Sequence, residues 1–339
     1  MSTEVSSSYF DVIVVGGGIF GSCAAFHSQK LGRKTLLVEQ FELNHSNGSS
    51  HGKSRIIRYA HQEKKYLPLV QDSYLQISEM EALRNDKLWK KTGLIWASST
   101  SDIDDMVDIL KSYNLDHEVL RGSEISARFP QFFLDDLWIG LVDPMGGVLY
   151  ADKCIKAFQE EFVKLGGIVK EHEEVLTHEE EEEVVKVRTN RMLYSAGKVI
   201  FTVGSWIKKY FPEVPLKIKL ESIAVCYWRT KKPNDAGLFE PNKFPVFIVS
   251  DKNDHRFLFG LPAVDHDGAA KICYHSGEQF DGVSYPEEHS QISEDDNYVI
   301  DFYPGSKKIL IGGCGSGSGF KRSPSIDVSF FSFARFKKQ

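Results

Sequence analysis

The chain has few cysteines, no long apolar run and no excess of positive charge. Lysine and arginine together number 41 against 47 aspartate and glutamate residues, so the net charge at pH 7 is −6. This balance disfavours a nucleic-acid-binding protein, which needs a basic surface to meet the phosphates. The longest apolar stretches are a handful of residues, far short of the ~20 that a membrane helix requires. We therefore expect neither a nucleic-acid nor a membrane partner.

The cysteines also argue against two classes of protein. They form no CxxC pair and no cluster with histidine, which disfavours a disulfide framework and a zinc site, and we assign no metal ligands. The five are Cys23, Cys154, Cys226, Cys273 and Cys314. The N-terminal residues lack a basic segment followed by an apolar core, so no secretory signal is expected. These features predict a protein of a reducing, intracellular compartment.

What is present fits a folded chain of about two domains. The length of 339 residues and the apolar fraction of 42% are ordinary for such a protein. Residues 11–15, 22–31 and 34–39 have the pattern of a strand, a helix and a second strand, which together form a βαβ unit. Further helices are expected at 62–90 and 151–165, strands at 93–97, 166–170, 184–187 and 198–202, and an antiparallel sheet within 216–280. The pattern predicts an α/β fold in which a nucleotide-binding domain is interleaved with an antiparallel β-rich domain.

A glycine fingerprint lies inside the βαβ unit. Gly16, Gly18 and Gly21 follow the first strand and open the helix, and Glu39 ends the second strand. In this context the glycines allow a tight turn, a close approach of the backbone to a pyrophosphate, and close packing of helix on strand. Glu39 would accept hydrogen bonds from a ribose diol and would repel a 2′-phosphate, which argues against NADP. The fingerprint alone does not separate FAD from NAD.

A basic segment rich in small residues follows. It spans residues 46–58 and contains Ser50, His51, Arg55 and Arg58. Small residues allow backbone N–H groups to approach a ligand, and the arginines supply fixed positive charge for a reduced flavin or a substrate carboxylate. Composition alone also allows a solvated basic loop.

The segment His45–Arg58 and the fingerprint resemble the monomeric sarcosine oxidase family, which includes peroxisomal sarcosine or L-pipecolate oxidases. Further matches run in order along the chain to about residue 325: Lys91–Leu94, Gly146–Tyr150, Thr202–Trp206, Val225–Trp228, Gly260–Pro262, Lys271–His275 and Ile311–Lys321. The resemblance implies FAD rather than NAD, and a two-domain flavoprotein like D-amino-acid oxidase or glutathione reductase. It implies a monomer that oxidises a secondary amino acid (sarcosine, L-pipecolate or L-proline) to an imine and reduces O2 to H2O2.

The same resemblance implies roles for individual residues. Arg58 and Lys321 match positions that hold the substrate carboxylate, His275 lies near the substrate amine, and Lys271 faces dioxygen. A fixed cation at Lys271 would stabilise negative charge as it develops on oxygen. The expected cofactor-binding residues are Gly16, Gly18, Gly21, Glu39, Ser50, His51, Arg55, Val175, Gly204 and Gly317.

The chain departs from the family in three places. Phe259 stands where the family usually has tyrosine, and Ser318 where it usually has histidine. After residue 296 several dozen family residues are missing, including the cysteine that links the flavin covalently, so we expect FAD to be held non-covalently. The alternatives are an NAD-linked dehydrogenase of the same fold and an inactive or FAD-deficient deletion variant.

The domain boundaries follow from the same matches. An FAD-binding domain is expected over 10–90, 147–215 and 297–325, a substrate domain over 91–146 and 216–296, and a short tail over 326–339. The family suggests a peroxisomal location. The terminal residues 336–339 are no SKL-type signal, so a cytoplasmic location stays open.

Overall fold

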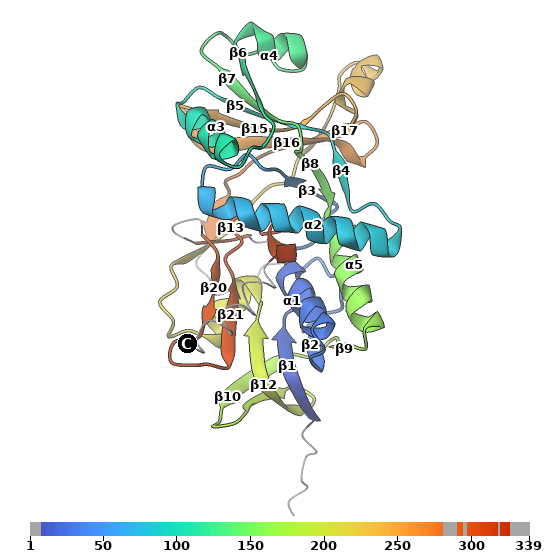
Figure 1. Ribbon diagram of the computed structural model, residues 1–339, viewed down its shortest axis with the longest axis vertical. Helices are drawn as coiled ribbons and strands as arrows, with labels where there is room; N and C mark the ends of the chain where they lie inside the picture. Colours follow the sequence, from blue (N-terminus) through green and yellow to red (C-terminus); the bar gives the residue numbers. More distant parts are fainter. Residues whose placement is uncertain (1–7, 281–289, 294–296, 318, 326–339) are drawn as a thin grey trace, which may run out of the picture. The chain divides into compact units, whose positions relative to one another are not determined.

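The computed structural model describes residues 8–280, 290–293, 297–317 and 319–325 (Figure 1). The chain divides into two compact units. Unit 1 comprises Met1–Gly52, Asp152–Glu221 and Gln279–Gln339, and unit 2 comprises Lys53–Ala151 and Ser222–Glu278. The expected tail at 326–339 lies outside the described residues, and the expected deletion after residue 296 adjoins residues 294–296, which also lie outside them.

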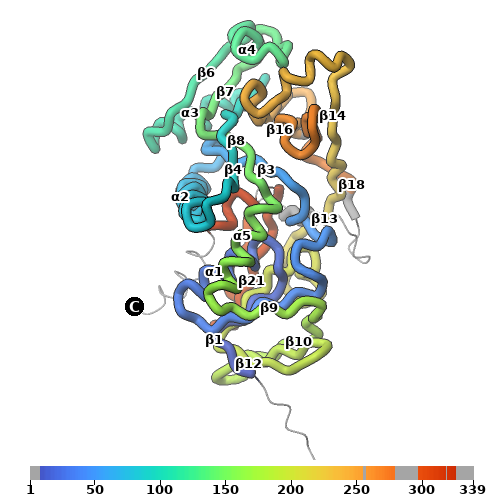
Figure 2. Tube along the Cα trace, turned by 90° about the vertical axis from the view of Figure 1, so that its right-hand side faces the viewer, coloured from blue at the N-terminus to red at the C-terminus, as the bar shows by residue number. Residues whose placement is uncertain are grey.

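Unit 1 is built on a mostly parallel sheet, which Figure 2 shows from the side. Its parallel strands lie in the order β9 (Ile168–Lys170), β2 (Thr35–Val38), β1 (Ser8–Val15), β12 (Leu193–Phe201) and β21 (Ile309–Gly313). β10 (Val175–Glu180), β11 (Val185–Thr189) and β20 (Val299–Phe302) extend it with antiparallel pairs. The central strands are buried apolar runs, as expected for a parallel sheet covered on both faces.

Helices pack on this sheet. α1 (Ile19–Lys30) and α5 (Ala151–Lys164) lie side by side, and Phe26 of α1 meets Phe158 of α5 edge to face at 5.5 Å between ring centroids. The remaining small elements are η2 (Gly204–Trp206), α6 (Ile207–Tyr210), η4 (Ser323–Ser325) and a three-stranded sheet of β18 (Glu278–Phe280), β13 (Ile218–Ser222) and β19 (Ser290–Ser293).

Unit 2 contains a mainly antiparallel seven-stranded sheet. Its strands lie in the order β14 (Tyr227–Arg229), β17 (Ala269–Tyr274), β16 (Asp254–His266), β15 (Val246–Asp251), β5 (Leu94–Ser98), β7 (Ile139–Asp143) and β6 (Glu118–Arg121). Only β15 and β5 pair in parallel among the pairs of this sheet. A second sheet contains β3 (Ser54–Ile57), β8 (Gly147–Tyr150) and β4 (Trp89–Lys91).

Unit 2 also contains helical segments, one of which packs on the seven-stranded sheet. They are η1 (Lys64–Tyr66), α2 (Leu67–Arg84), α3 (Asp102–Ser112), α4 (Ser123–Arg128) and η3 (Pro233–Phe239). α3 places Ile103, Met106 and Leu110 in one core cluster with Leu94 and Trp96 of β5. The i, i+3, i+7 spacing of these α3 residues gives the helix one apolar stripe, and this stripe covers one face of the sheet.

The expected α/β fold, with a parallel sheet and an antiparallel sheet, is confirmed. Several boundaries differ from expectation, and those of two helices show why. Helix α1 begins at Ile19, three residues before the expected start. The expected helix 62–90 ends at Arg84, because Asn85 adopts a left-handed conformation with φ 51° and the chain continues into β4.

The units also differ from the expected domains. Residues 53–90 and 147–151 were both expected with the FAD-binding domain, whereas the structure groups them with unit 2, and it groups residues 216–221 with unit 1. The reason is strand pairing: β3 and β4 both bond to β8, which belongs to the same unit.

Candidate active site

The glycine loop of unit 1 has a backbone that side chains would obstruct. Gly16 has φ +98°, and a Cβ atom there would lie 2.7 Å from the carbonyl oxygen of Thr202. A Cβ on Gly21 would lie 1.8 Å from the carbonyl oxygen of Gly16. A Cβ on Gly18 would approach the Ser50 hydroxyl to 3.0 Å. The close packing of this loop therefore requires glycine at these positions, as the dinucleotide-binding fingerprint predicts.

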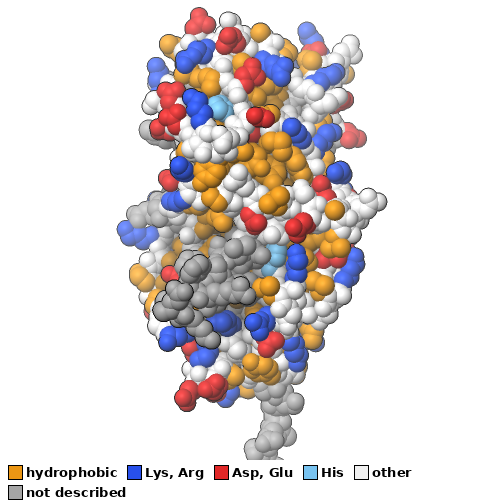
Figure 3. Space-filling model, in the orientation of Figure 1, with side chains coloured by type: hydrophobic (Ala, Val, Ile, Leu, Met, Phe, Trp, Pro, Cys, Tyr) orange, Lys and Arg blue, Asp and Glu red, His pale blue; other side chains and the backbone are white. Residues whose placement is uncertain are grey.

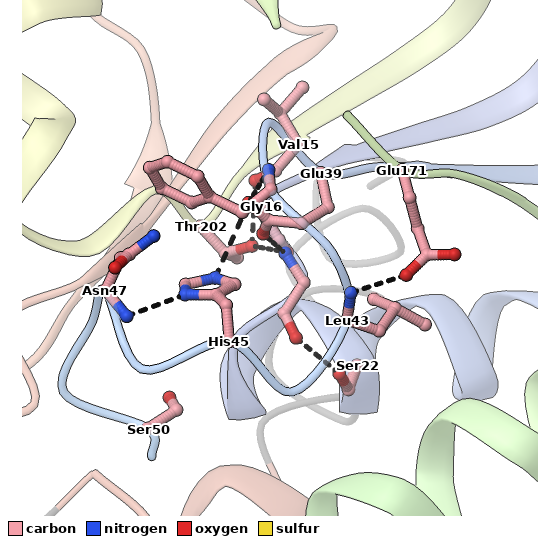
Figure 4. A network of polar contacts seen from close by, with 12 residues as sticks. Val15, Gly16, Ser22, Glu39, Leu43, His45, Asn47, Ser50, Glu171 and Thr202 are labelled. Atoms are coloured by element: carbon pink, nitrogen blue, oxygen red, sulfur yellow. Dashed lines mark hydrogen bonds and ion pairs between the residues drawn. The ribbon is translucent and has the colours of Figure 1, made fainter. Parts of the chain in front are cut away.

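Hydrogen bonds hold this loop in place. The carbonyl of Gly17 accepts from Ser22 Oγ at 2.9 Å and from Gln159 Nε2 at 3.1 Å. The Thr202 hydroxyl donates to the carbonyls of Val15 at 3.0 Å and Gly16 at 3.1 Å. Because these bonds come from α1, α5 and the residue after β12, three separate elements fix the loop. Figure 4 shows the contacts of Ser22 and Thr202.

Glu39 is the buried acid at the end of β2. Its side chain is 5% exposed, and its carboxylate accepts from the backbone N–H groups of Gly17 at 2.6 Å and Phe41 at 3.0 Å. His45 Nε2 lies 3.6 Å from the same carboxylate (Figure 4). An ionised carboxylate has about four acceptor sites, so these contacts leave capacity for the hydroxyls of a ribose. The residues present fit the adenosine diphosphate part of FAD.

Ser50 and His51 come from the basic segment. The Ser50 hydroxyl accepts a hydrogen bond from the N–H of Ile19 at 3.0 Å, so it satisfies a donor in the first turn of α1. His51 donates from Nδ1 to the carbonyl of Gly48 at 2.5 Å, which leaves Nε2 as the acceptor when the ring is neutral. The first part of the basic segment is therefore ordered against the glycine loop.

The other unit 1 residues lie after strands of the parallel sheet or at its border. Val175 is buried and begins β10, Gly204 begins η2 with φ +53°, and Gly317 has φ +67° in the loop after β21. Lys321 is buried a few residues later. Loops that follow neighbouring parallel strands gather at one edge of the sheet, which is where ligands bind in open α/β sheets. The expected position Ser318 lies outside the described residues.

Arg58 is a buried cation of unit 2. It is 8% exposed, its Nη1 donates to the carbonyl of Ala60, and the same nitrogen lies 3.0 Å from His61 Nδ1. The guanidinium lies over the Trp96 ring at 4.8 Å. Asp143 is the nearby acid, and its carboxylate accepts from the backbone N–H groups of Tyr59 at 2.6 Å and Ala60 at 3.1 Å. Burial raises the pKa of Asp143, whereas these N–H groups and Arg58 lower it.

Lys271, Phe259 and His275 belong to the same face of the seven-stranded sheet as Trp96. Register pairs Lys271 with Leu261 and Cys273 with Phe259, and Leu261, Phe259 and Trp96 share one core cluster. Residues paired across strands point to the same face. His275 follows β17, its N–H donates to the carbonyl of Phe257 at 2.7 Å, and its ring lies 6.2 Å from that of Phe259.

Burial, followed by the positive charge of Arg55, lowers the pKa of Lys271 from 10.5 to about 8, whereas Asp265 opposes this change. Sequence reasoning identified neither Asp265 nor Asp143. Each is an acid near the end of a strand whose other residues are mostly apolar. Because acids are rarely buried without a partner, an acid in such a strand is the sequence signal that could have identified these two residues.

Comparison with known proteins identifies the family. Residues 11–326 match the family of FAD dependent oxidoreductases. A sarcosine oxidase homologue of Caenorhabditis elegans is 45% identical over 379 aligned positions, which cover 98% of this chain and 99% of that protein. The peroxisomal sarcosine oxidase of Mus musculus is 31% identical, with 94% of this chain and 90% of that protein covered.

The chain belongs to the FAD-dependent oxidoreductase family. Within it the chain is a homologue of the sarcosine oxidases, a flavin-dependent amine oxidase, and the expectation of FAD is confirmed. Among solved structures, the amino acid oxidase NikD aligns with a TM-score of 0.81 at 18% identity, covering 98% of this chain and 95% of that one. Glycine oxidase from Geobacillus kaustophilus aligns with a TM-score of 0.77 at 17% identity, covering 98% and 96%. These likenesses show the shared fold.

Three further findings bear on the class of protein. Within the described ranges, no group of three or more His, Cys, Asp or Glu residues is arranged to hold a metal ion. No described helix is long and apolar enough to cross a membrane. On the face shown in Figure 3, acidic and basic side chains are interspersed.

Proposed function

We propose that this oxidoreductase converts a secondary amino acid, of the sarcosine, L-pipecolate or L-proline type, to its imine and reduces O2 to H2O2. Two electrons and two protons leave the C–H and N–H bonds of the substrate and are passed to dioxygen. The observation that carries the proposal is the face of the unit 2 sheet, which combines one buried guanidinium, one buried ammonium and one imidazole with aromatic side chains.

Arg58 and Lys321 are the proposed carboxylate-binding residues. The Arg58 guanidinium is a planar fork suited to two parallel hydrogen bonds, and the Lys321 ammonium adds a point charge. Arg58 is already oriented by Ala60, His61 and Trp96, so little side-chain entropy remains to be lost on binding. The 31%-identical relative that is named a sarcosine oxidase supports this substrate class.

His275 is proposed to act at the amine. A neutral imidazole beside an amine favours the uncharged form, which is the form whose C–H bond is activated. The ring of Phe259, which carries no hydroxyl, lies 6.2 Å from the His275 ring, so the imidazole is the polar member of this pair.

FAD, when bound, accepts a hydride equivalent and returns electrons to dioxygen. We propose that Gly16, Gly18, Gly21, Glu39 and Ser50 hold its adenosine diphosphate part. His51, Arg55, Val175, Gly204 and Gly317 complete the proposed set. Lys271 supplies a fixed positive charge where negative charge develops on dioxygen.

We also propose that FAD is held non-covalently and that the protein is a peroxisomal or cytoplasmic monomer. The alignment of 379 positions exceeds the 339 residues of this chain, so the Caenorhabditis elegans homologue has residues without a counterpart here. This difference supports the missing segment after residue 296. It also favours a second candidate, a variant of the oxidase that binds FAD poorly and is inactive.

One experiment separates the two candidates. The purified protein is incubated with FAD, and visible absorbance after gel filtration reports binding. Sarcosine, L-pipecolate and L-proline are then added one at a time without oxygen, and loss of flavin absorbance reports oxidation. Admission of air should restore the absorbance and release peroxide. Absence of bound flavin supports the inactive variant, whereas bound flavin that no secondary amino acid reduces contradicts the proposed substrate class.

A further inference from the structure

Asp265 is the centre of a buried polar network in unit 2. Its Oδ2 accepts hydrogen bonds from the hydroxyl of Ser54 at 2.7 Å and from the hydroxyl of Tyr227 at 2.8 Å. The same oxygen lies 4.0 Å from Nζ of Lys271, and Lys271 donates to the carbonyl of Ser54 at 3.2 Å. Strands β3, β14, β16 and β17 therefore meet at one carboxylate.

The network concentrates positive charge in a buried place. Lys271 is 6% exposed and Asp265 7%. Arg55 Nη1 donates to the carbonyl of Ser54 at 2.8 Å, so Arg55 and Lys271 bind the same oxygen. Lys271 is buried and Arg55 is partly buried, so the two cations repel each other and both lose contact with water. The carboxylate of Asp265 contacts the Lys271 ammonium and also accepts from the hydroxyls of Ser54 and Tyr227.

The geometry assigns Asp265 as the positioning residue for Lys271: its carboxylate, anchored by Ser54 and Tyr227, fixes the ammonium and keeps it charged beside Arg55. The importance of Asp265 for catalysis rests on the proposed role of Lys271 in oxygen reduction. The ion pair between Asp265 and Lys271 does not depend on that role. Asp265 touches neither substrate nor cofactor in the proposal. It acts through Lys271.

The charges around Lys271 determine the expected direction. Burial and Arg55 lower the pKa of Lys271, and Asp265 and Cys273 raise it, with a resulting pKa of about 8. Lys53 lies on the other side of Asp265, where its Nζ donates to the backbone carbonyl at 3.2 Å. Burial and the hydrogen bond to Asp265 raise the pKa of Tyr227, so this group stays a neutral donor. His266 packs edge to face on Tyr227 at 4.5 Å between ring centroids. Removal of the Asp265 charge must therefore favour the neutral form of Lys271.

The test is the protonation of Lys271 in the full-length protein, measured without reference to activity. Trace acetic anhydride labels neutral amines, and peptide mass spectrometry across a pH series gives the midpoint for each lysine. In Asp265→Asn the Lys271 midpoint should fall by about one pH unit, since an opposite charge at this distance has been removed. Asp265→Glu should restore the wild-type midpoint. Asp267→Asn, which removes an exposed carboxylate two residues away, should leave it unchanged.

Two further arms separate this role from a general effect on folding. The double variant Arg55→Gln/Asp265→Asn removes one charge of each sign, so the midpoint should return toward that of the wild type. Circular dichroism verifies that each variant is folded. An unchanged Lys271 midpoint in folded Asp265→Asn overturns the inference, as does a failure of Asp265→Glu to restore it.

The holoenzyme links the inference to oxygen. As the pH is raised, the rate at which air reoxidises the reduced flavin should begin to fall at a lower pH in Asp265→Asn than in the wild type. The pH dependence of anaerobic flavin reduction by the amino acid should be unchanged. If the wild-type flavin is not reduced by any secondary amino acid, the proposed function fails and the labelling result still stands. If reduction and reoxidation shift together, Asp265 acts on the whole site and the assignment to Lys271 is wrong.

Discussion

The guanidinium of Arg58 lies 4.8 Å from the centre of the Trp96 ring. The ring is itself fixed, because Trp96 Nε1 donates to the hydroxyl of Ser250 at 3.1 Å and Ser250 donates to Asp102 at 3.1 Å. A cation over a desolvated indole ring gains about 2 kcal/mol. Asp102, at the start of α3, thus contributes to the position of Arg58 through two intervening side chains.

We predict that Arg58→Ala weakens carboxylate binding and leaves bound flavin intact. Loss of a charge-assisted pair of roughly 1.5–3 kcal/mol corresponds to a weakening of roughly ten- to 150-fold. The measurement is an anaerobic titration of the flavin spectrum with acetate, which carries the carboxylate and cannot be oxidised as an amine. Arg58→Lys is the matched variant, and it should recover only part of the affinity because the planar fork is absent. A variant that loses FAD but retains acetate affinity assigns Arg58 to the cofactor instead.

Acid or denaturant should release the flavin from the folded holoprotein. The family resemblance predicts that the linking cysteine has no counterpart in this chain, and four of the five cysteines that are present are buried. After denaturation and ultrafiltration, flavin absorbance should appear in the filtrate. Colour that remains with the polypeptide would show a covalent bond, and peptide mass spectrometry would then identify the attached cysteine.

Gly21→Ala should abolish FAD binding and lower the melting temperature. The new Cβ would meet the carbonyl of Gly16, which is held by Thr202, so α1 must shift away from β1. Overpacking of this kind costs about 1–3 kcal/mol. Gly237→Ala is the control, since its nearest neighbour would be the flexible end of Lys243 at 3.9 Å. Equal flavin affinity in Gly21→Ala and the wild type would show that the loop is not the binding site.

The stability of the protein should fall as the pH decreases from about 6.5 to about 4, in part because of His27. Burial, followed by the charge of Lys30, lowers the pKa of His27 to about 4, and its Nε2 donates to the carbonyl of Pro324 at 3.1 Å. The unfolded chain binds a proton at a higher pH than the folded chain, so stability from this group is present at neutral pH and is lost on acidification. The full difference is about 3 kcal/mol.

The variant His27→Gln tests this dependence, because glutamine donates to the same carbonyl and does not titrate. The melting temperature of the variant should decrease less between pH 7 and pH 5 than that of the wild type. His172→Asn removes an exposed histidine at a positive φ that asparagine tolerates, and it should retain the wild-type dependence. Equal acid sensitivity in His27→Gln would show that other groups dominate.

The sequence predicts the parts of the fold that depend on local pattern. The run 11–15 falls within β1, and Glu39 directly follows β2, because a buried parallel strand and a glycine turn are both encoded by neighbouring residues. The helix at 151–165 is confirmed within one residue at its end, since its apolar face repeats at helical spacing.

Features that depend on distant pairing could not be predicted. β4 lies inside the range expected to be helical, because its three residues form a strand only through β8. Likewise the acid Asp265 meets Ser54 across 211 positions of sequence. Such contacts are determined by sheet register, which a single sequence does not reveal. Residue roles that came from the family resemblance stay predictions until the variants are measured.

The interleaving of the two units has a consequence for synthesis. In unit 1, β12 pairs with β1 on one side and with β21 (Ile309–Gly313) on the other. Strand β12 therefore lacks its neighbour β21 until residue 313 has been synthesised. In unit 2, the pairing of β5 with β15 and of β16 with β17 is possible once Tyr274 has emerged. The unit that starts second along the chain can therefore finish folding first. Until then one edge of β12 lacks its partner β21, and an unpaired apolar strand edge is a site where nascent chains aggregate.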